Sequence, residues 1–209
     1  MDFWTIEKMV QAEVIEKKSK FIANLYPVQS IEEAEELMKE VKKKYHDARH
    51  NCVAYRIQGK DQLIEKSSDD GEPSGTAGGP MLHILQKNQL ANVLIVVTRY
   101  FGGILLGTGG LVRAYSESLQ KAIKQSKLIK KCEGIEMQVT VEYAEWDNFQ
   151  HYCKNHQILI TNVEYEEFIN CKLELELEKK QKLMQDFETK NIILREIKEI
   201  TKKYIIKSI

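Results

Sequence analysis

Two glycine-rich phrases between Asp69 and Tyr115 constrain the fold more than any other feature of this chain. The first lies within residues 67–79 and is too polar and too rich in turn-forming residues to be anything but a loop. Between the phrases, Val93–Thr98 is nearly all β-branched, as is typical of a strand buried on both faces. The second phrase, FGGILLGTGG, leads into an apolar helical pattern from about Leu111 to Lys127. The sequence therefore predicts a buried strand between two flexible loops, the second of which leads into a helix.

The apolar spacing before and after these loops predicts two α+β domains. From Ile135 onward the order is β-α-β-β-α-β, that of a ferredoxin-like domain, with a last strand over Ile192–Ile200. We place the first domain at residues 1–131 and the second at residues 132–209. Basic minus acidic residues give 20 − 16 = +4 through Cys132 and 11 − 15 = −4 beyond it, and opposite biases agree with two domains. The first domain is expected to hold strands over residues 9–16, 20–28 and 51–58, a helix from Ser30 to about Tyr45, and a short helix from Pro80 to Leu90.

Charge and cysteine usage narrow the class of protein. The chain has 31 basic and 31 acidic residues, so its overall charge points to neither nucleic acid nor membrane, and no DNA specificity is evident. Its four cysteines lie far apart without a C-x-x-C pair, which favours reduced thiols in a cytoplasmic protein over a disulfide framework. No secretory signal is expected at the N-terminus, and the apolar runs are too short to span a bilayer.

A family resemblance rests on the two phrases themselves. DDGEPSGTAGGP, followed by VTRYFGGILLGTGGLVRAYSES, closely resembles the signature of the Impact family, and SKFIA and ARHNCVAYR also resemble that family. The resemblance covers both halves of the chain and matches the bacterial two-domain members. Arg49 departs from the pattern, in which a small hydroxyl residue is expected.

The resemblance implies a fold and a setting. The first domain is expected to be like the second domain of a small-subunit ribosomal protein, with a mixed sheet and helices on one face. The second is expected to be similar to the last domain of elongation factor G. Eukaryotic members of the family restrain the starvation-responsive translation kinase by competing for its activator, so the resemblance implies a role in translation or its regulation.

The same residues make a physical case for binding an anion. The run Gly107–Gly110 precedes a helix, so free backbone N–H groups and the positive end of the helix dipole meet there, and Thr108 can either cap the helix or donate its hydroxyl to a ligand. Arg99 and Arg113 can hold a phosphate bidentately, and nearby aromatic rings offer faces for stacking a base. The predicted binding groove comprises Arg99, Tyr100, Phe101, Gly102, Gly103, Gly107, Thr108, Gly109, Gly110, Arg113, Tyr115, Asp69, Asp70, Glu72, Ser74, Thr76 and His50.

Each of these features has a second interpretation. The glycines can simply permit tight turns and close packing. The carboxylates near Asp70 can hold Mg²⁺, or Asp70-Gly71 is a turn while Glu72 pairs with Arg99 or Arg113, which we favour. No adjacent base activates the hydroxyls of Ser74 and Thr76. A zinc site at His46, His50 and Cys52 is disfavoured because the histidines do not share a helix face, and His50 is expected either to order the loop or to face the groove.

Three functions follow from this reading. The preferred one is a non-catalytic binding protein that acts in translation and contacts RNA, the ribosome or a ribosome-associated protein through the glycine-rich groove. The second is a Mg²⁺-dependent enzyme acting on a phosphorylated small molecule or nucleotide. The third is a protein–protein adaptor. The preferred function needs no cofactor and no resident metal.

Overall fold

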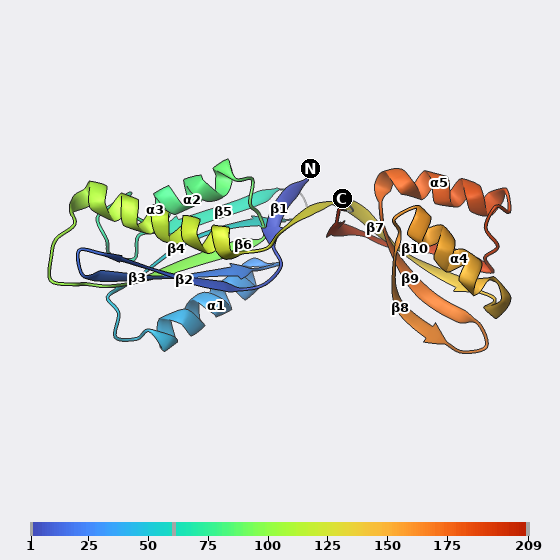
Figure 1. The fold of residues 1–209 in the computed structure, drawn as a ribbon, viewed down its shortest axis with the longest axis horizontal. Coiled ribbons are helices and arrows are strands. Elements are labelled where there is room, and N and C mark those ends of the chain that lie inside the picture. Colours follow the sequence, from blue (N-terminus) through green and yellow to red (C-terminus); the bar gives the residue numbers. More distant parts are fainter. Residues whose placement is uncertain (1, 60–61, 208–209) are drawn as a thin grey trace. The chain divides into compact units, whose positions relative to one another are not determined.

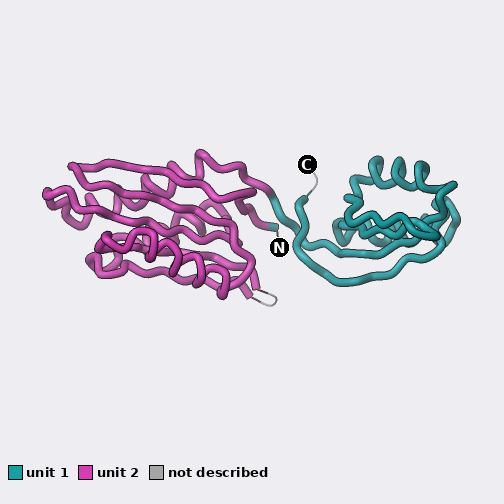
Figure 2. Tube along the Cα trace, turned by 90° about the horizontal axis from the view of Figure 1, so that it is seen from below, with its two compact units in different colours: residues 1–2, 130–209 teal, residues 3–129 magenta. Residues whose placement is uncertain are grey.

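The computed structural model describes residues 2–59 and 62–207, which form two compact units (Figure 2). One unit comprises Phe3–Ile129, and the other comprises residues 130–207 together with Asp2. Within the described residues no helix is both long and apolar enough to cross a membrane.

The first unit is a five-stranded sheet covered on both faces. Its strand order is β2-β3-β6-β4-β5, and every neighbouring pair is antiparallel. Helix α1 covers one face, and α2 and α3 cover the other (Figure 1). The prediction of a mixed sheet with helices on one face is therefore wrong. The elements are β1 (Phe3–Ile6), β2 (Val10–Glu16), β3 (Ser19–Pro27), α1 (Ile31–Lys44), β4 (His50–Gln58), β5 (Leu63–Ser68), α2 (Gly78–Lys87), β6 (Val93–Tyr100) and α3 (Gly107–Gln125).

The central strand β6 explains why both faces need cover. Its residues from Val93 to Arg99 are all buried, as the β-branched run predicts. Ile95 and Val97 belong to the core under α2 and α3, whereas Leu94 and Val96 belong to the core under α1. Burying each of these aliphatic side chains stabilises the fold by about 1.5–3 kcal/mol. A single layer of helices would leave half of this strand in water.

The antiparallel register gathers several loops at one end of this sheet. Strand β6 ends where β4 begins, because Arg99 pairs with His50, and β3 begins beside the same point, because Lys20 pairs with Tyr100. Strand β5 ends there as well, since Ser68 pairs with Val53. We call this region the loop end of the sheet. It consists of residues 17–18, 45–49, 69–77 and 101–106.

The second unit has the expected order β-α-β-β-α-β. Its antiparallel strands lie in the order β10-β7-β9-β8, and β9 alternates buried with half-buried residues, so one face of the sheet carries the core. The last strand begins four residues later than expected and contains a bulge between Glu199 and Thr201. The elements are β7 (Leu128–Val141), a 3₁₀ turn (Tyr143–Glu145), α4 (Trp146–Asn155), β8 (Leu159–Tyr165), β9 (Ile169–Glu176), α5 (Leu177–Glu188) and β10 (Glu196–Ile206).

The glycines of the second phrase have different structural roles. A Cβ on Gly102 would lie 2.0 Å from the backbone carbon of Lys18, so only glycine fits against the β2–β3 turn. A Cβ on Gly109 would meet nothing within 4 Å, and this residue lies inside α3. The first glycine is required by packing and the second is not.

We therefore expect opposite effects from two identical substitutions. Gly102→Ala should lower the free energy of unfolding of the first unit by about 1–3 kcal/mol, because the backbone must move. Gly109→Ala should raise it by about 0.5–1 kcal/mol through helix propensity. Urea unfolding followed by Trp4 fluorescence in a Trp146→Phe background reports this unit, since the chain has two tryptophans. Equal effects of the two changes would contradict the packing role of Gly102.

Candidate functional site

A buried ion pair joins the two glycine-rich phrases. Arg99 Nη1 donates to Glu72 Oε1 at 2.7 Å and to Oε2 at 3.0 Å, and the two side chains are 7% and 3% exposed. The guanidinium carbon of Arg99 lies 5.5 Å from the ring centroid of Phe21 and 5.7 Å from that of Phe101. Of the two partners expected for Glu72, the structure selects Arg99. Arg99 thus ties the end of β6 to the 69–77 loop.

Tyr115 extends this pair into α3. Its hydroxyl donates to Glu72 Oε1 at 2.8 Å, and Cys52 Sγ lies 3.2 Å from the same hydroxyl. The ring packs edge-on against Phe21 and is 0% exposed. The prediction that Tyr115 offers a face for stacking is therefore wrong, because its position on α3 faces the sheet. Burial raises the pKa of Tyr115 and raises that of Cys52 to about 12, so both are neutral at physiological pH.

Asp69 organises the first phrase and the start of α2. Its Oδ1 accepts hydrogen bonds from the backbone N–H groups of Ala77 and Gly78 at 2.9 and 2.8 Å, and Oδ2 accepts one from Gly75 at 2.8 Å. Helix α2 has no cap from the residue before it, so Asp69 satisfies its N-terminus from a distance in sequence. Partial burial raises the pKa of Asp69, but the three N–H donors outweigh it and hold the pKa below its ordinary value.

The favoured turn at Asp70-Gly71 is present. Glu72 N–H donates to Asp69 O at 2.9 Å, and the two central residues have φ of 42° and 86°, the left-handed values of a type I′ turn. Asp70 Oδ2 accepts from the backbone N–H of Asn51 at 2.7 Å. His50 Nδ1 lies 2.9 Å from the Asp70 carbonyl oxygen, which can only accept, so Nδ1 carries a proton. His50 therefore orders the loop, which is one of the two roles expected for it.

The three carboxylates do not converge on a common point. Asp69 binds backbone N–H groups, Asp70 binds Asn51, and Glu72 binds Arg99 and Tyr115. In the described part of the chain, no group of three or more His, Cys, Asp or Glu side chains is arranged to hold a metal ion.

The hydroxyls of the first phrase have separate places. Thr76 is buried, and its Oγ1 donates to the Pro73 carbonyl at 2.6 Å. Ser74 is exposed. Thr76 therefore stabilises the loop, while Ser74 faces solvent.

Helix α3 begins at Gly107, four residues earlier than expected. Thr108 lies inside its first turn and is exposed, so the prediction that Thr108 caps the helix is wrong; the residue at the cap position is Leu106, whose side chain makes no capping hydrogen bond. Positive φ at Gly103 and Gly107 (86° and 70°) lets the chain turn from β6 into the helix. Arg113 is exposed on the outer face of α3.

A groove of ≈ 410 Å³ opens at the loop end. Four predicted site residues contribute to it, and three that the sequence analysis did not assign join them. Of these three, Arg49 was noticed as a departure from the family pattern, while Asp47 and Leu105 carried no signal. The groove is lined by Asp47, Arg49, His50, Arg99, Tyr100, Phe101 and Leu105.

Tyr100 and Asp47 form one wall of this groove. The Tyr100 hydroxyl donates to Asp47 Oδ1 at 2.7 Å. This bond to a carboxylate raises the pKa of Tyr100 to about 12 and lowers that of Asp47. Among the other lining residues, Phe101 is 52% and Leu105 is 83% exposed, so the groove has an apolar rim.

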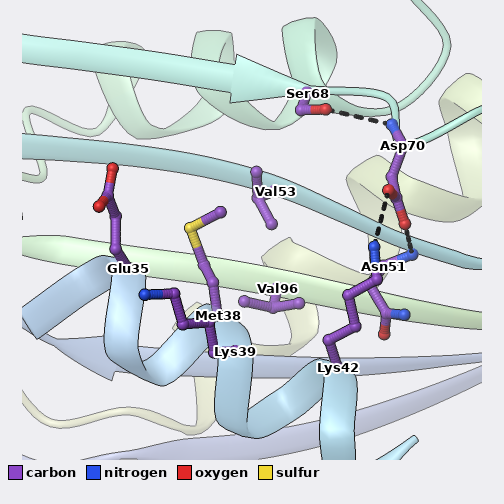
Figure 3. A pocket seen from close by; sticks show the side chains of 9 residues that line it. All are labelled: Glu35, Met38, Lys39, Lys42, Asn51, Val53, Ser68, Asp70 and Val96. Atoms are coloured by element: carbon purple, nitrogen blue, oxygen red, sulfur yellow. Dashed lines mark hydrogen bonds and ion pairs between the residues drawn. The ribbon is translucent and has the colours of Figure 1, made fainter. Parts of the chain in front are cut away.

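A second cavity, of ≈ 280 Å³, lies between α1 and the sheet (Figure 3). Met38, Val53 and Val96 give it apolar walls, and Lys39 and Lys42 stand at its α1 side. One predicted site residue, Asp70, lines it, and its other lining residues come from α1 and three separate strands. We assign no function to it.

The buried Glu72–Arg99 pair is expected to control the stability of the first unit. Glu72→Ala should destabilise the first unit by about 3–5 kcal/mol, because it leaves the Arg99 charge buried without a partner. Adding Arg99→Met should restore most of that loss, since the apolar pair no longer needs compensation. Urea unfolding of the single and double variants, followed by Trp4 fluorescence, measures both. A double variant as unstable as Glu72→Ala would show that the loss is not electrostatic.

A second prediction concerns how the contribution of Asp69 to stability depends on pH. Because the folded pKa of Asp69 is lowered, its contribution to stability is present above the unfolded pKa, near 3.8, and is lost as pH falls through the folded value. Asp69→Asn should therefore cost about 1.5–3 kcal/mol at pH 7 and much less at pH 3. Urea midpoints across this range test it, with Glu117→Gln on the exposed side of α3 as the control for losing one charge. A difference that does not shrink in acid would contradict the assignment.

Comparison with known proteins places both halves of the chain. Residues 17–123 match the Impact N-terminal domain, and residues 139–188 match a domain of unknown function, DUF1949. The IMPACT family member YvyE of Bacillus subtilis is 37% identical over 179 residues, which cover 86% of this chain and 81% of that protein.

Two solved structures are also similar. The crystal structure of a hypothetical protein is 31% identical with a TM-score of 0.63, covering 96% of this chain and 98% of that one. The two-domain translational regulator Yih1 is 27% identical over 59% of this chain and 47% of its own, but its TM-score of 0.37 carries no structural argument. Since the family's N-terminal domain spans half of the chain and YvyE matches along most of its length, this chain belongs to the IMPACT family as a two-domain member of the bacterial type.

Proposed function

We propose that this protein is a non-catalytic binding module of the translation apparatus, and that it contacts RNA through the loop end of its first unit. The observation that carries the proposal is an imbalance of free charge at that end. Lys17, Lys18 and Arg49 are exposed there, and Arg113 is exposed on α3, the helix that follows the 101–106 loop.

The carboxylates at the same end are already engaged. Glu72 is neutralised by Arg99, and Asp69 is held by three backbone N–H groups. Asp70 binds the backbone of Asn51 and lies 3.6 Å from Lys42. The fourth carboxylate at this end, Asp47, is exposed and accepts a hydrogen bond from Tyr100, so it offsets one of the four exposed cations. The exposed cations still outnumber it, which favours a locally positive surface on a chain without net charge. Phosphate groups are the ligand that such a surface attracts.

An exposed ring complements these cations. Phe101 is half exposed at the rim of the groove, and its inner face meets the Arg99 guanidinium, which fixes its position. Stacking of an unpaired base on such a ring contributes about 1–3 kcal/mol and tolerates any base. A cationic edge with a stacking ring fits single-stranded or looped RNA better than a duplex.

The translation setting comes from the family. Its resemblance implies a first domain like the second domain of a small-subunit ribosomal protein, over residues 1–131. It also implies a ferredoxin-like second domain similar to the last domain of elongation factor G, over residues 132–209. We adopt both as part of the proposal, because such relatives work on RNA. A role of this kind is carried out in the cytoplasm.

The competing functions have weaker support. An enzyme with Mg²⁺ at Asp69, Asp70 and Glu72 would have to break the contacts that form the loop. A protein adaptor would use the exposed apolar rim at Phe101 and Leu105 without needing the cations. A measurement of RNA binding separates the preferred function from the enzyme and from the adaptor.

Binding of a fluorescent single-stranded RNA, followed by anisotropy across a salt series, tests the proposal. The affinity should fall as salt rises, and Arg49→Glu with Arg113→Glu should weaken it and reduce the salt slope by about 2. Lys87→Glu is the control for a single charge reversal, on an exposed side chain at the other end of α2, and its effect is compared with that of Arg49→Glu alone. Arg99 is unsuitable for charge reversal, since a buried Glu in its place would unfold the unit.

Absence of RNA binding at low salt would sink the proposal. Equal weakening by Lys87→Glu and by Arg49→Glu would also contradict it, because the contact would then be nonspecific. Loss confined to the loop-end variants places the RNA at the loop end.

A further inference from the structure

The Arg99 guanidinium has an edge that the protein does not use. Its Nη1 binds both oxygens of Glu72, but Nε is buried without any hydrogen-bond partner. Nη2 likewise has no partner among the described residues, and it is not among the atoms sealed from solvent. A buried N–H without an acceptor is rare in a native fold and calls for an explanation.

The geometry of arginine says what would satisfy this edge. The guanidinium is planar, and its Nε–H and Nη2–H bonds run parallel along one side, forming a fork that matches two oxygens of a phosphate or carboxylate. Glu72 binds the far corner through both of its oxygens, and the guanidinium carbon lies 5.5 Å from the ring centroid of Phe21. The fork is therefore held in a fixed orientation before any ligand arrives.

Nη2 is the end of this edge that a ligand can approach directly, whereas Nε is closed to solvent and is reached only after a neighbouring side chain shifts. Arg99 lines the groove at the loop end, whose volume of ≈ 410 Å³ falls within the usual range of about 300–1,000 Å³ for small-molecule sites. Arg49 lines the same groove and adds a positive charge, while Asp47 adds a negative one whose oxygen is taken by Tyr100. The charges of Arg49, Arg99, Asp47 and the Glu72 that pairs with Arg99 sum to 2 − 2 = 0, so the groove would hold an anionic group through its hydrogen-bond donors and not through excess charge.

We infer that the Nε–Nη2 edge of Arg99 is a subsite for a single phosphate group of a nucleotide, with the base or sugar directed to the exposed Phe101 and Leu105. This rests on the proposed function, which it deepens by naming the group that enters the groove. His50 supplies a further contact: its Nδ1 is committed to the Asp70 carbonyl, and its ring lines the same groove. Nε2, the acceptor nitrogen of this tautomer, can take a hydrogen bond from a ligand hydroxyl.

The side-chain Nε–Hε resonance of Arg99 provides a direct readout by ¹H–¹⁵N NMR. Titration with inorganic phosphate and with uridine 5′-monophosphate should shift this resonance saturably. Phe101→Ala should weaken binding of the nucleotide but not of phosphate, which separates the stacking contact from the anion contact. Phe101 is half exposed, so this variant is expected to fold.

Arg99→Lys tests the fork itself. Lysine keeps the positive charge facing Glu72 but lacks the second parallel N–H, so nucleotide affinity should fall by about tenfold. Arg195→Lys is the matched control, because Arg195 also pairs with a carboxylate, Glu142, and stacks on a ring, Phe168, yet belongs to the second unit. Its affinity should equal that of the unaltered protein.

If the Arg99 Nε–Hε resonance does not shift in either titration, the inference is overturned, even if Arg99→Lys fails to fold. Equal affinity of a folded Arg99→Lys variant would do the same. If single-stranded RNA binds in a way that depends on Arg49 and Arg113 while Arg99 stays silent, the subsite is wrong and the proposed function stands. If Arg99 responds to phosphate and nucleotide while RNA does not bind, the subsite stands without an RNA partner.

Discussion

The arrangement of the first unit depends on one buried ion pair, between Glu72 of the first glycine-rich phrase and Arg99 at the end of β6. The Tyr115 hydroxyl adds α3 to the same point. A buried pair is not by itself a source of stability, because desolvation of the charges offsets their attraction. The pair instead fixes how three elements meet. The 69–77 loop, β6 and α3 come together in the arrangement that keeps both charges paired. The groove at the loop end takes its shape from that arrangement.

The glycine-rich phrases serve packing and access together. Gly102 lets β6 pass against the β2–β3 turn, where any side chain would collide with backbone. Gly103 and Gly107 adopt left-handed φ values and turn the chain into α3. Between them, Ile104 and Leu105 are left exposed, although apolar side chains of this size are usually buried. The sequence allows these glycines either an architectural role or a binding role. In the structure, the turns that they make leave the apolar side chains at the rim of the groove exposed.

Sequence reasoning identified local contacts of the glycine-rich phrases better than it identified which side chains are accessible. The Asp70-Gly71 turn and an ion pair of Glu72 were expected, and both are present. Tyr115 was also assigned to the stacking surface, although helical spacing places it with Leu111 and Leu119 on the apolar stripe of α3, where the structure buries it. The capping of α2 by Asp69 was not foreseen, since its partners lie up to nine residues away and follow from the loop conformation.

What the sequence by itself determined is the part governed by local chemistry. The β-branched run of β6 requires burial on both faces, the Asp-Gly pair requires a left-handed turn, and the order of elements in the second unit follows from their apolar periods. Only the tertiary structure decided which end of the sheet collects the loops, and which edge of Arg99 stays free. The antiparallel register sets His50 beside Arg99, and the packing of α3 brings Tyr115 to Glu72. Such contacts join residues far apart in the chain, so their geometry is fixed by packing and not by any local preference.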